Sequence, residues 1–194
     1  MASSALLMDS ARKLFDEMAV KDELSWTTII AGFVRNNNLD AAREVFNKMD
    51  EKLVVAWNAM ISGYVHKGFI SKALEMFRMM SLQGIKQDEF TYSSVLSACG
   101  EAGLFHFGKQ LHAYILRTEA ITGGQFLVSV SNALITLYGK CGKVDQARKI
   151  FGQITVKDLV SWNAVLSAYV NARRINEAKH FFEKMPEKIH WHGQ

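Results

Sequence analysis

Residues 54–88 read VVAWNAMISGYVHKGFISKALEMFRMMSLQGIKQD, and this stretch decides the fold. Apolar residues recur three and four positions apart from Trp57 onward, and the same stripe returns from Ile70 onward. This spacing is typical of an amphipathic helix with one buried face. A short polar segment ending in Gly68 separates the two stripes. The stretch therefore predicts a hairpin of two helices joined by a tight turn.

The same hairpin recurs along the whole chain. In register with 54–88 (35 residues), the other units are 23–53 (31 residues), 89–127 (39), 128–158 (31) and 159–189 (31). An Ala and a Phe four residues apart mark each second helix except that of 89–127: Ala42/Phe46, Ala73/Phe77, Ala147/Phe151 and Ala178/Phe182. Ala11 and Phe15 repeat this pair. Residues 1–22 are therefore read as the second half of a further unit, and 190–194 as a C-terminal tail.

A hairpin of about 31 residues cannot cover its own apolar faces, so neighbouring hairpins must stack. The sequence predicts an all-α fold, an α-solenoid of helix-turn-helix repeats in a single array. Because stripes at helical spacing are normally core, the Ala and Phe columns are expected to be buried. The same holds for the aromatic column Phe33, Tyr64, Tyr138 and Tyr169.

Composition excludes several other classes of protein. The chain has 194 residues, 49% hydrophobic and 22% charged, with one proline and a net charge of +4, which is typical of a globular protein and only mildly basic. Cys99 and Cys141 form no CxxC motif, so no metal site is predicted, and no cofactor or catalytic motif stands out. No apolar stretch is long enough to span a membrane. The helical pattern begins by about Leu6, so either a targeting leader is absent or the chain is a fragment.

The residues that mark the repeat resemble a known family. Val-x-Trp-Asn-Ala-Met-Ile-Ser-Gly-Tyr, then Ala-Leu-x-Met-Phe-x-x-Met and Gly-Ile-x-x-Asp, are similar to the plant pentatricopeptide repeat (PPR). The tetratricopeptide alternative requires 34-residue units with a different Trp-Leu-Gly-Tyr pattern. Unit 54–88 resembles the P type, 89–127 the L type, and the 31-residue units and half unit 1–22 the S type. This mixture resembles the PLS subclass, whose members are mostly organellar RNA-editing specificity factors.

The resemblance implies a right-handed superhelix that binds single-stranded RNA, one nucleotide per repeat. In this family the fifth and last residues of a unit read the base. These residues are Thr27/Leu53, Asn58/Asp88, Ser93/Leu127, Asn132/Asp158 and Asn163/Ile189. Family rules link the Asn/Asp pairs to uracil, Asn with Ile to a pyrimidine and Thr to a purine. The expected RNA is therefore purine, U, any base, U, pyrimidine, from 5′ to 3′.

Second positions in this family hold the base between neighbouring units. Here they are Leu24, Val55, Phe90, Ser129 and Val160. Four of them are apolar, which suits contact with the face of a base, and the aromatic ring of Phe90 can stack on it. The alternative is that these side chains only pack between hairpins.

The resemblance thus implies the specificity module of an organellar RNA-editing or RNA-processing factor, in a mitochondrion or chloroplast. The chain carries neither the H-x-E nor the C-x-x-C motif of a zinc deaminase, so a deaminase is expected from a further region or from another chain. Apolar faces at the terminal repeats favour a homodimer. The alternative function is a protein–protein interaction scaffold with little RNA affinity, because only two of the five reading pairs are intact.

Overall fold

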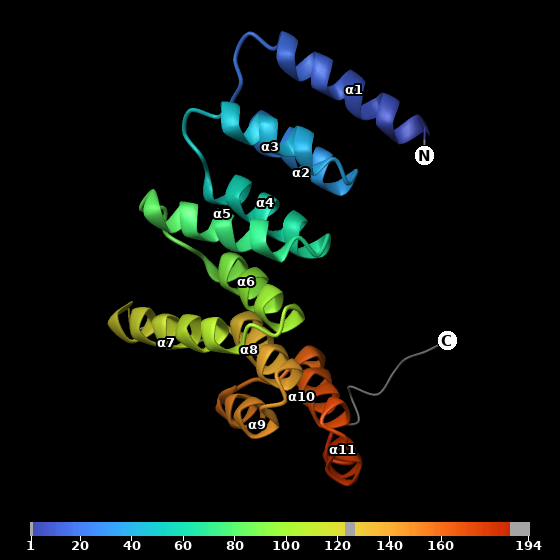
Figure 1. Ribbon diagram of the computed structural model, residues 1–194, viewed down its shortest axis with the longest axis vertical. Helices are drawn as coiled ribbons and strands as arrows, with labels where there is room; N and C mark the ends of the chain where they lie inside the picture. The colour runs from blue at the N-terminus through green and yellow to red at the C-terminus, as the bar shows by residue number, and fades with distance from the viewer. Residues whose placement is uncertain (1, 123–126, 187–194) are drawn as a thin grey trace. The chain divides into compact units, whose positions relative to one another are not determined.

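The computed structural model describes residues 2–122 and 127–186, and helices are the only regular secondary structure in this part of the chain (Figure 1). They are α1 (Ala2–Glu17), α2 (Glu23–Arg35), α3 (Leu39–Lys48), α4 (Val54–His66), α5 (Ile70–Leu82), α6 (Glu89–Glu101), α7 (Phe105–Thr122), α8 (Val128–Lys140), α9 (Val144–Gln153), α10 (Leu159–Asn171) and α11 (Ile175–Phe182). The prediction of an all-α fold is confirmed. The first helix begins at Ala2, in agreement with a helical pattern that is present by about Leu6.

The helices keep one register throughout the chain. The even-numbered helices α2 to α10 each have 13 residues, and each begins at the first residue of its unit. Their partners α3 to α11 begin at the seventeenth residue. The fifteenth residue has a positive φ in every unit, and it is glycine at Gly68, Gly103 and Gly142. The other two are Asn37 (φ 61°) and Arg173 (φ 58°), where the left-handed backbone has to accommodate a Cβ.

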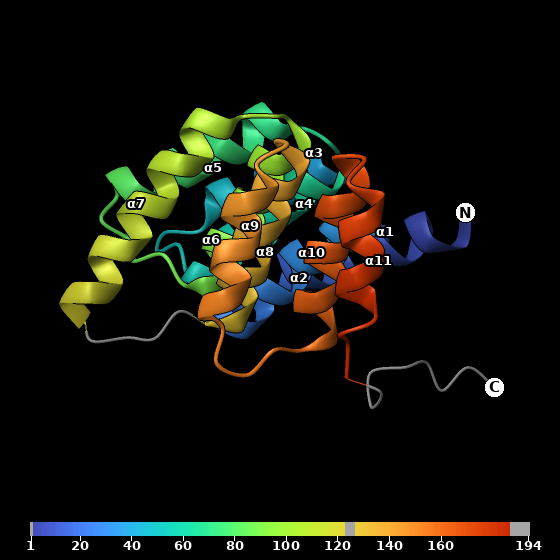
Figure 2. The same ribbon diagram turned by 90° about the horizontal axis from the view of Figure 1, so that it is seen from below.

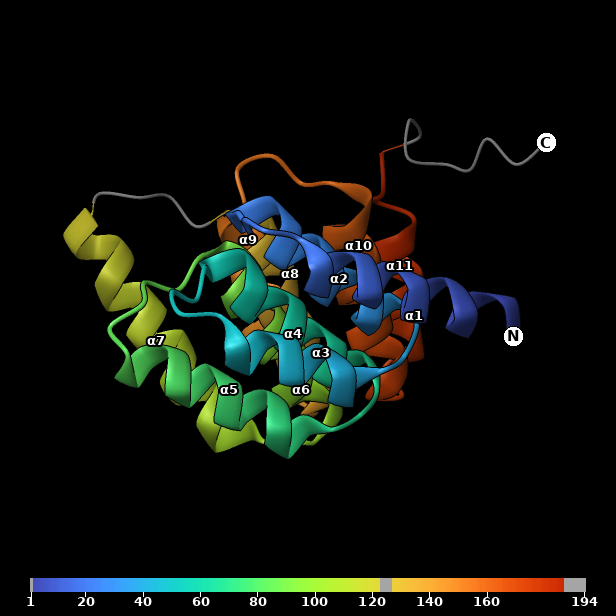
Figure 3. The ribbon, with the colours of Figure 1, turned by 90° about the horizontal axis from the view of Figure 1, so that it is seen from above.

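The chain divides into two compact units, Met1–Val95 and Leu96–Gln194, and the boundary falls inside α6. In the first unit α2 packs against α1, α3 and α4, and α4 packs against α3 and α5 (Figure 3). Edge-on aromatic pairs join successive hairpins: Phe15 meets Trp26 with ring centroids 4.8 Å apart, and Phe46 meets Trp57 at 4.7 Å. The Phe of one unit thus packs against the first helix of the next.

The second unit repeats this arrangement (Figure 2). Helix α8 packs against α7, α9 and α10, and α10 packs against α9 and α11. Phe151 meets Trp162 edge-on at 4.9 Å, in the same positions as the pairs of the first unit. Helices α8 and α10 approach closely at Gly139, where a Cβ would lie 2.6 Å from that of Ala168.

Most residues of the predicted core columns are buried, Ala11 and Phe77 are half-buried, and Phe182 is exposed. Ala42, Ala73, Ala147 and the aromatic residues Phe33, Tyr64, Tyr138 and Tyr169 are each at most 8% exposed. Phe182, predicted to be buried with Phe46, is 48% exposed, while its neighbour Phe181 is 4% exposed. The reason is geometric: this column faces the next hairpin, and no helix is described after α11. No helix in the described ranges has the length and apolar character needed to cross a bilayer.

Replacing Arg173 by Gly is expected to raise the free energy of unfolding by about 0.5–1 kcal/mol. The left-handed conformation costs a residue with a Cβ about 1–2 kcal/mol, and part of this gain is offset by the greater chain entropy of glycine. Asn37→Gly is the matched control and should change stability less, because Asn tolerates this conformation. Urea unfolding of the three proteins checks the prediction, and an unchanged or lower stability of Arg173→Gly would contradict it.

Phe46→Ala is expected to cost about 3–5 kcal/mol of unfolding free energy, because it removes a fully buried ring from the contact between hairpins. Leu82→Ala, at a side chain 72% exposed, should stay within about 0.5 kcal/mol of the parent. Circular dichroism during urea unfolding measures both. A cost below about 1 kcal/mol for Phe46→Ala would show that this contact does not hold the stack together.

Candidate functional site

Where a further unit follows in the described residues, the last residue of a unit lies at the start of that further unit's first helix, at the N-cap position. Asp22 and Asp158 cap α2 and α10, and their side chains accept hydrogen bonds from the backbone N–H of Ser25 and Ser161. Asp88 accepts the backbone N–H of Thr91 in the same way, at 2.8 Å. Satisfying a free N–H in the first turn stabilises the helix. The stacking of first helices then places this cap beside the fifth residue of the first helix in the preceding unit.

The first such cluster joins Asn58 of α4 to residues at the start of α6. The Asn58 Nδ2 group donates to the Asp88 carboxylate and lies 2.9 Å from each of its oxygens. The Thr91 hydroxyl lies 2.6 Å from Asn58 Oδ1 and 2.8 Å from Asp88 Oδ1. Thr91 is fully buried and Asn58 is 7% exposed, whereas Asp88 is exposed. The carboxylate thus faces outward and holds the amide beneath it.

The second cluster has the same arrangement in α8 and α10. Asn132 Nδ2 lies 3.1 Å and 3.4 Å from the two Asp158 carboxylate oxygens. The Ser161 hydroxyl donates to Asp158 Oδ1 at 2.7 Å. Asn132 Oδ1 is buried and has no hydrogen-bond partner among the described residues. The two pairs that the sequence singled out are therefore both assembled, but their amides are held differently.

Hydrogen bonding makes both carboxyl groups stronger acids. Burial alone would raise the pKa of Asp88, but the hydrogen bonds from Thr91 and Asn58 outweigh it and keep the pKa below the ordinary value of 3.8. Burial opposes the same shift at Asp158, where the bonds from Ser161 and Asn132 lower the pKa below that value. Both side chains are therefore anionic at neutral pH.

The other predicted reading residues form no such cluster in the described structure. The Thr27 hydroxyl donates to the Glu23 carbonyl oxygen of its own helix at 2.8 Å, and Leu53 is half-buried. The Ser93 hydroxyl is buried without a partner among the described residues, and Leu127 is 54% exposed. Ser93 and Leu127 belong to different compact units, so their separation is not defined. Asn163 is exposed, and Ile189 lies outside the described residues, as do residues 190–194.

The second positions present an apolar surface on the first helices. Leu24, Val55, Phe90 and Val160 are 72%, 63%, 59% and 58% exposed, and Ser129 is also exposed. Exposed large apolar side chains at one repeated position are available to a flat apolar partner. Beside Val160 and Asn163 of α10 runs a groove of about 260 Å³ that reaches Lys140 of α8.

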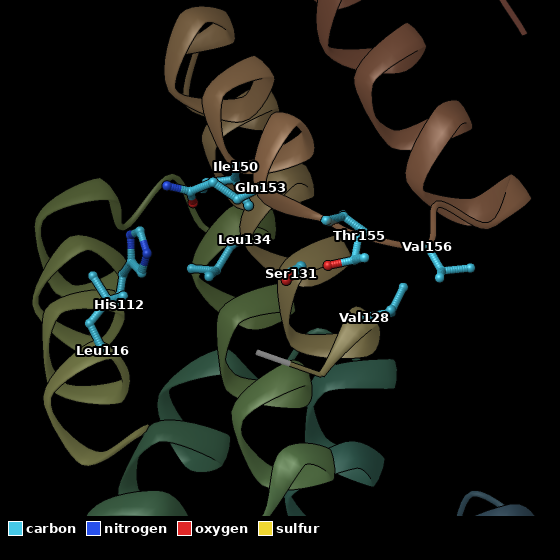
Figure 4. Close-up of a pocket in the computed structure, with 10 residues that line it drawn as sticks. His112, Leu116, Val128, Ser131, Leu134, Ile150, Gln153, Thr155 and Val156 are labelled. Carbon is cyan, nitrogen blue, oxygen red and sulfur yellow. The ribbon is translucent and has the colours of Figure 1, made fainter. Parts of the chain in front are cut away.

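A further cavity of about 450 Å³ lies among α7, α8 and α9 (Figure 4). Its lining includes His112, Leu116, Ser131, Leu134 and Gln153. No motif in the sequence indicated it, because it depends on where α7 lies relative to α9. In the described residues no three His, Cys, Asp or Glu side chains are grouped as metal ligands would be.

Asp88→Ala is expected to lower the unfolding free energy by about 1 kcal/mol at pH 7, because it removes a helix cap and the anchor of the Asn58 amide. Since folding lowers the pKa of Asp88, its stabilisation is complete above about pH 5 and is lost as the pH falls through 3.8 and then through the folded-state pKa. The difference between parent and variant should therefore shrink in acid. Urea unfolding at pH 7, 5 and 3 measures it, with Asp50→Ala as the exposed control. A difference independent of pH would contradict the prediction.

Known proteins of one family share the repeat units of this chain. A family model described as PPR repeat matches residues 24–52, 90–116, 129–159 and 160–188, and one described as PPR repeat family matches 52–101. A pentatricopeptide repeat-containing protein of Arabidopsis thaliana is 53% identical over 165 residues, covering 84% of this chain and 20% of that protein. Another from the same plant is 46% identical over 185 residues, covering 95% of this chain and 34% of that protein. The chain thus spans between a fifth and about a third of these relatives.

Solved structures share the fold. The pentatricopeptide repeat protein PPR10 from maize matches 93% of this chain with a TM-score of 0.69 at 23% identity, over 27% of its own length. PPR10 in complex with an 18-nt psaJ RNA element matches 89% of this chain with a TM-score of 0.65 at 23% identity, over 26% of its length. These likenesses agree with the α-solenoid prediction. With family models matched over most of its length, the chain belongs to the pentatricopeptide repeat family.

Proposed function

We propose that this chain is a single-stranded RNA-binding segment of a PLS-type pentatricopeptide repeat protein, in which the fifth and last residues of a unit together read one base. The observation that carries the proposal is the pair of Asn–Asp clusters. Asn58 and Asp88 are 30 residues apart in sequence and Asn132 and Asp158 are 26 apart, yet each amide is bonded to its carboxylate. An amide beside a carboxylate offers donors and acceptors suited to a base edge.

The surface around the clusters also suits a single strand. The exposed apolar second positions, Val55 and Phe90 beside the first cluster and Val160 beside the second, give a base a surface to stack on. Lys140 can meet a phosphate, although it pairs here with Glu101. The structural relative PPR10 was solved with an 18-nt psaJ RNA element, which supports RNA as the partner class.

The role in RNA editing and the organelle rest on the unit lengths and on the relatives. Units of 31, 35 and 39 residues resemble the S, P and L types of the PLS subclass. Two Arabidopsis relatives are named as chloroplastic and mitochondrial, which supports an organellar location. We propose that the chain supplies the address on the transcript, and that a deaminase, held in a further region or another chain, supplies the chemistry.

The alternative is a protein-binding scaffold, and the cavity among α7, α8 and α9 favours it. That cavity lies next to the second helix of the L-type unit, and much of its lining is apolar. A protein-binding scaffold does not need to discriminate between bases. Measuring RNA affinity and its dependence on sequence therefore distinguishes the two functions.

Fluorescence anisotropy with a labelled 12-nt single strand carrying purine-U-A-U-C is the test. Changing the second or the fourth nucleotide of this register from U to C should weaken binding about 5- to 50-fold, in the range of a mismatched base. Changing the third nucleotide, opposite Ser93, should matter little. Asn58→Ala should abolish the effect of the second nucleotide alone.

Two results would count against base reading. Equal affinity for the U and C strands would refute the family rule that links Asn/Asp pairs to uracil. An absence of RNA binding at low salt would favour the protein-binding scaffold. The affinity for RNA should also fall as the salt concentration rises, because contacts with phosphates weaken in salt.

A further inference from the structure

A hydroxyl at the third position of a unit accompanies Asp at the end of the unit before it. The three sequences are Asp22-Glu-Leu-Ser25, Asp88-Glu-Phe-Thr91 and Asp158-Leu-Val-Ser161. Where a unit ends in leucine, the third residue is apolar: Leu53 is followed by Ala56, and Leu127 by Val130. The hydroxyl and the carboxylate therefore occur together within this one chain.

Helix capping does not account for where these hydroxyls point. The Ser25 hydroxyl donates to the backbone carbonyl oxygen of Asp22 at 2.8 Å, and only its backbone N–H meets the carboxylate. The Thr91 and Ser161 hydroxyls instead meet carboxylate oxygens, at 2.8 Å and 2.7 Å. Asp88 and Asp158 each hold an Asn from the preceding first helix, and residues 1–22 contain no first helix that could supply one to Asp22. The hydroxyl turns toward the carboxylate where an amide is bound there.

The bonds around Asn58 fix the direction of its amide. Its Nδ2 group faces the Asp88 carboxylate and its Oδ1 faces the Thr91 hydroxyl, so a flipped amide would put oxygen against carboxylate and lose the bonds to Asp88. Asn132 is held on one side only, because the Ser161 hydroxyl bonds Asp158 and Asn132 Oδ1 has no partner among the described residues. The Thr91 hydroxyl thus holds the Asn58 amide on a second side, where Asn132 has no partner in the described part of the chain.

We infer that Thr91 and Ser161 are positioning residues for base reading, and that Thr91, whose one hydroxyl proton lies between the Asp88 carboxylate and the amide oxygen of Asn58, makes unit 54–88 the more discriminating of the two uracil readers. The inference rests on the proposed function. With Nδ2 fixed toward the carboxylate, the remaining N–H is a donor, which suits the O4 acceptor of uracil and opposes the N4 amino group of cytosine. A flipped amide would present its oxygen to the base instead, and this oxygen could accept a hydrogen bond from the N4 amino group of cytosine.

The test compares the ratio of affinities for U and C at the second and fourth nucleotides of the register. We expect a larger ratio at the second nucleotide in the parent chain. Thr91→Val should lower that ratio about five-fold, the effect of losing one hydrogen bond, and Thr91→Ser should retain it. Ser161→Ala should lower the ratio at the fourth nucleotide, because the Ser161 hydroxyl holds Asp158. Ser25→Ala, which removes a third-position hydroxyl away from any reading Asn, is the matched control.

A second measurement needs no RNA. The side-chain amide resonances of Asn58 in a ¹⁵N–¹H spectrum should exchange with solvent more slowly than those of Asn132. In Thr91→Val they should shift and exchange faster, while Ser25→Ala leaves them unchanged. Circular dichroism confirms that each variant is folded.

The outcomes separate this inference from the proposed function. If Asn58→Ala lowers the U-to-C ratio but Thr91→Val does not, the positioning role is overturned and base reading stands. If Asn58→Ala leaves the ratio unchanged, base reading by this unit is refuted, and the inference falls with it. An unchanged ratio at the fourth nucleotide in Ser161→Ala contradicts the positioning role even if Thr91→Val fails to fold.

Discussion

The edge-on contact between a Phe of one hairpin and a Trp of the next is the interaction on which the rest of the structure depends. Phe46 with Trp57 and Phe151 with Trp162 join neighbouring hairpins at ring distances of 4.7 Å and 4.9 Å. Because a single hairpin leaves an apolar face uncovered, this contact both stabilises the stack and sets the offset between successive first helices. At the contact of Phe151 with Trp162, this offset brings Asp158 to Asn132. Without it, two residues 26 positions apart would have no reason to meet.

Much of this could be predicted from the sequence because it repeats. Five aligned units reveal the helices, the core columns and the positions of Asn58, Asp88, Asn132 and Asp158. Phe182 shows where periodicity fails: a column predicts a core residue only if the neighbouring element that covers it is present. The repeat identifies the contact surface, but burial depends on the three-dimensional neighbour.

The hydrogen bonds within the clusters could not be derived in the same way. The sequence pairs Asn with Asp in both units, yet the distinction between them comes from Thr91 and Ser161, which belong to the following unit. The helix starts have a capping pattern that no prediction used, Asp followed three residues later by Ser or Thr. Which acceptor the hydroxyl chooses depends on side-chain geometry, because the carboxylate, the amide oxygen and a backbone carbonyl all compete for one proton.

The double role of the terminal aspartates has a consequence for how the array can be taken apart. The folding repeat runs from residue 54 to residue 88, but the bonded group of Asn58, Asp88 and Thr91 extends three residues into the next unit. The smallest cassette that carries this bonded group is therefore out of phase with the hairpin. A graft of residues 54–88 alone would transfer the amide and the carboxylate and leave their hydroxyl behind, so exchanged segments should end within the first turn of the following helix.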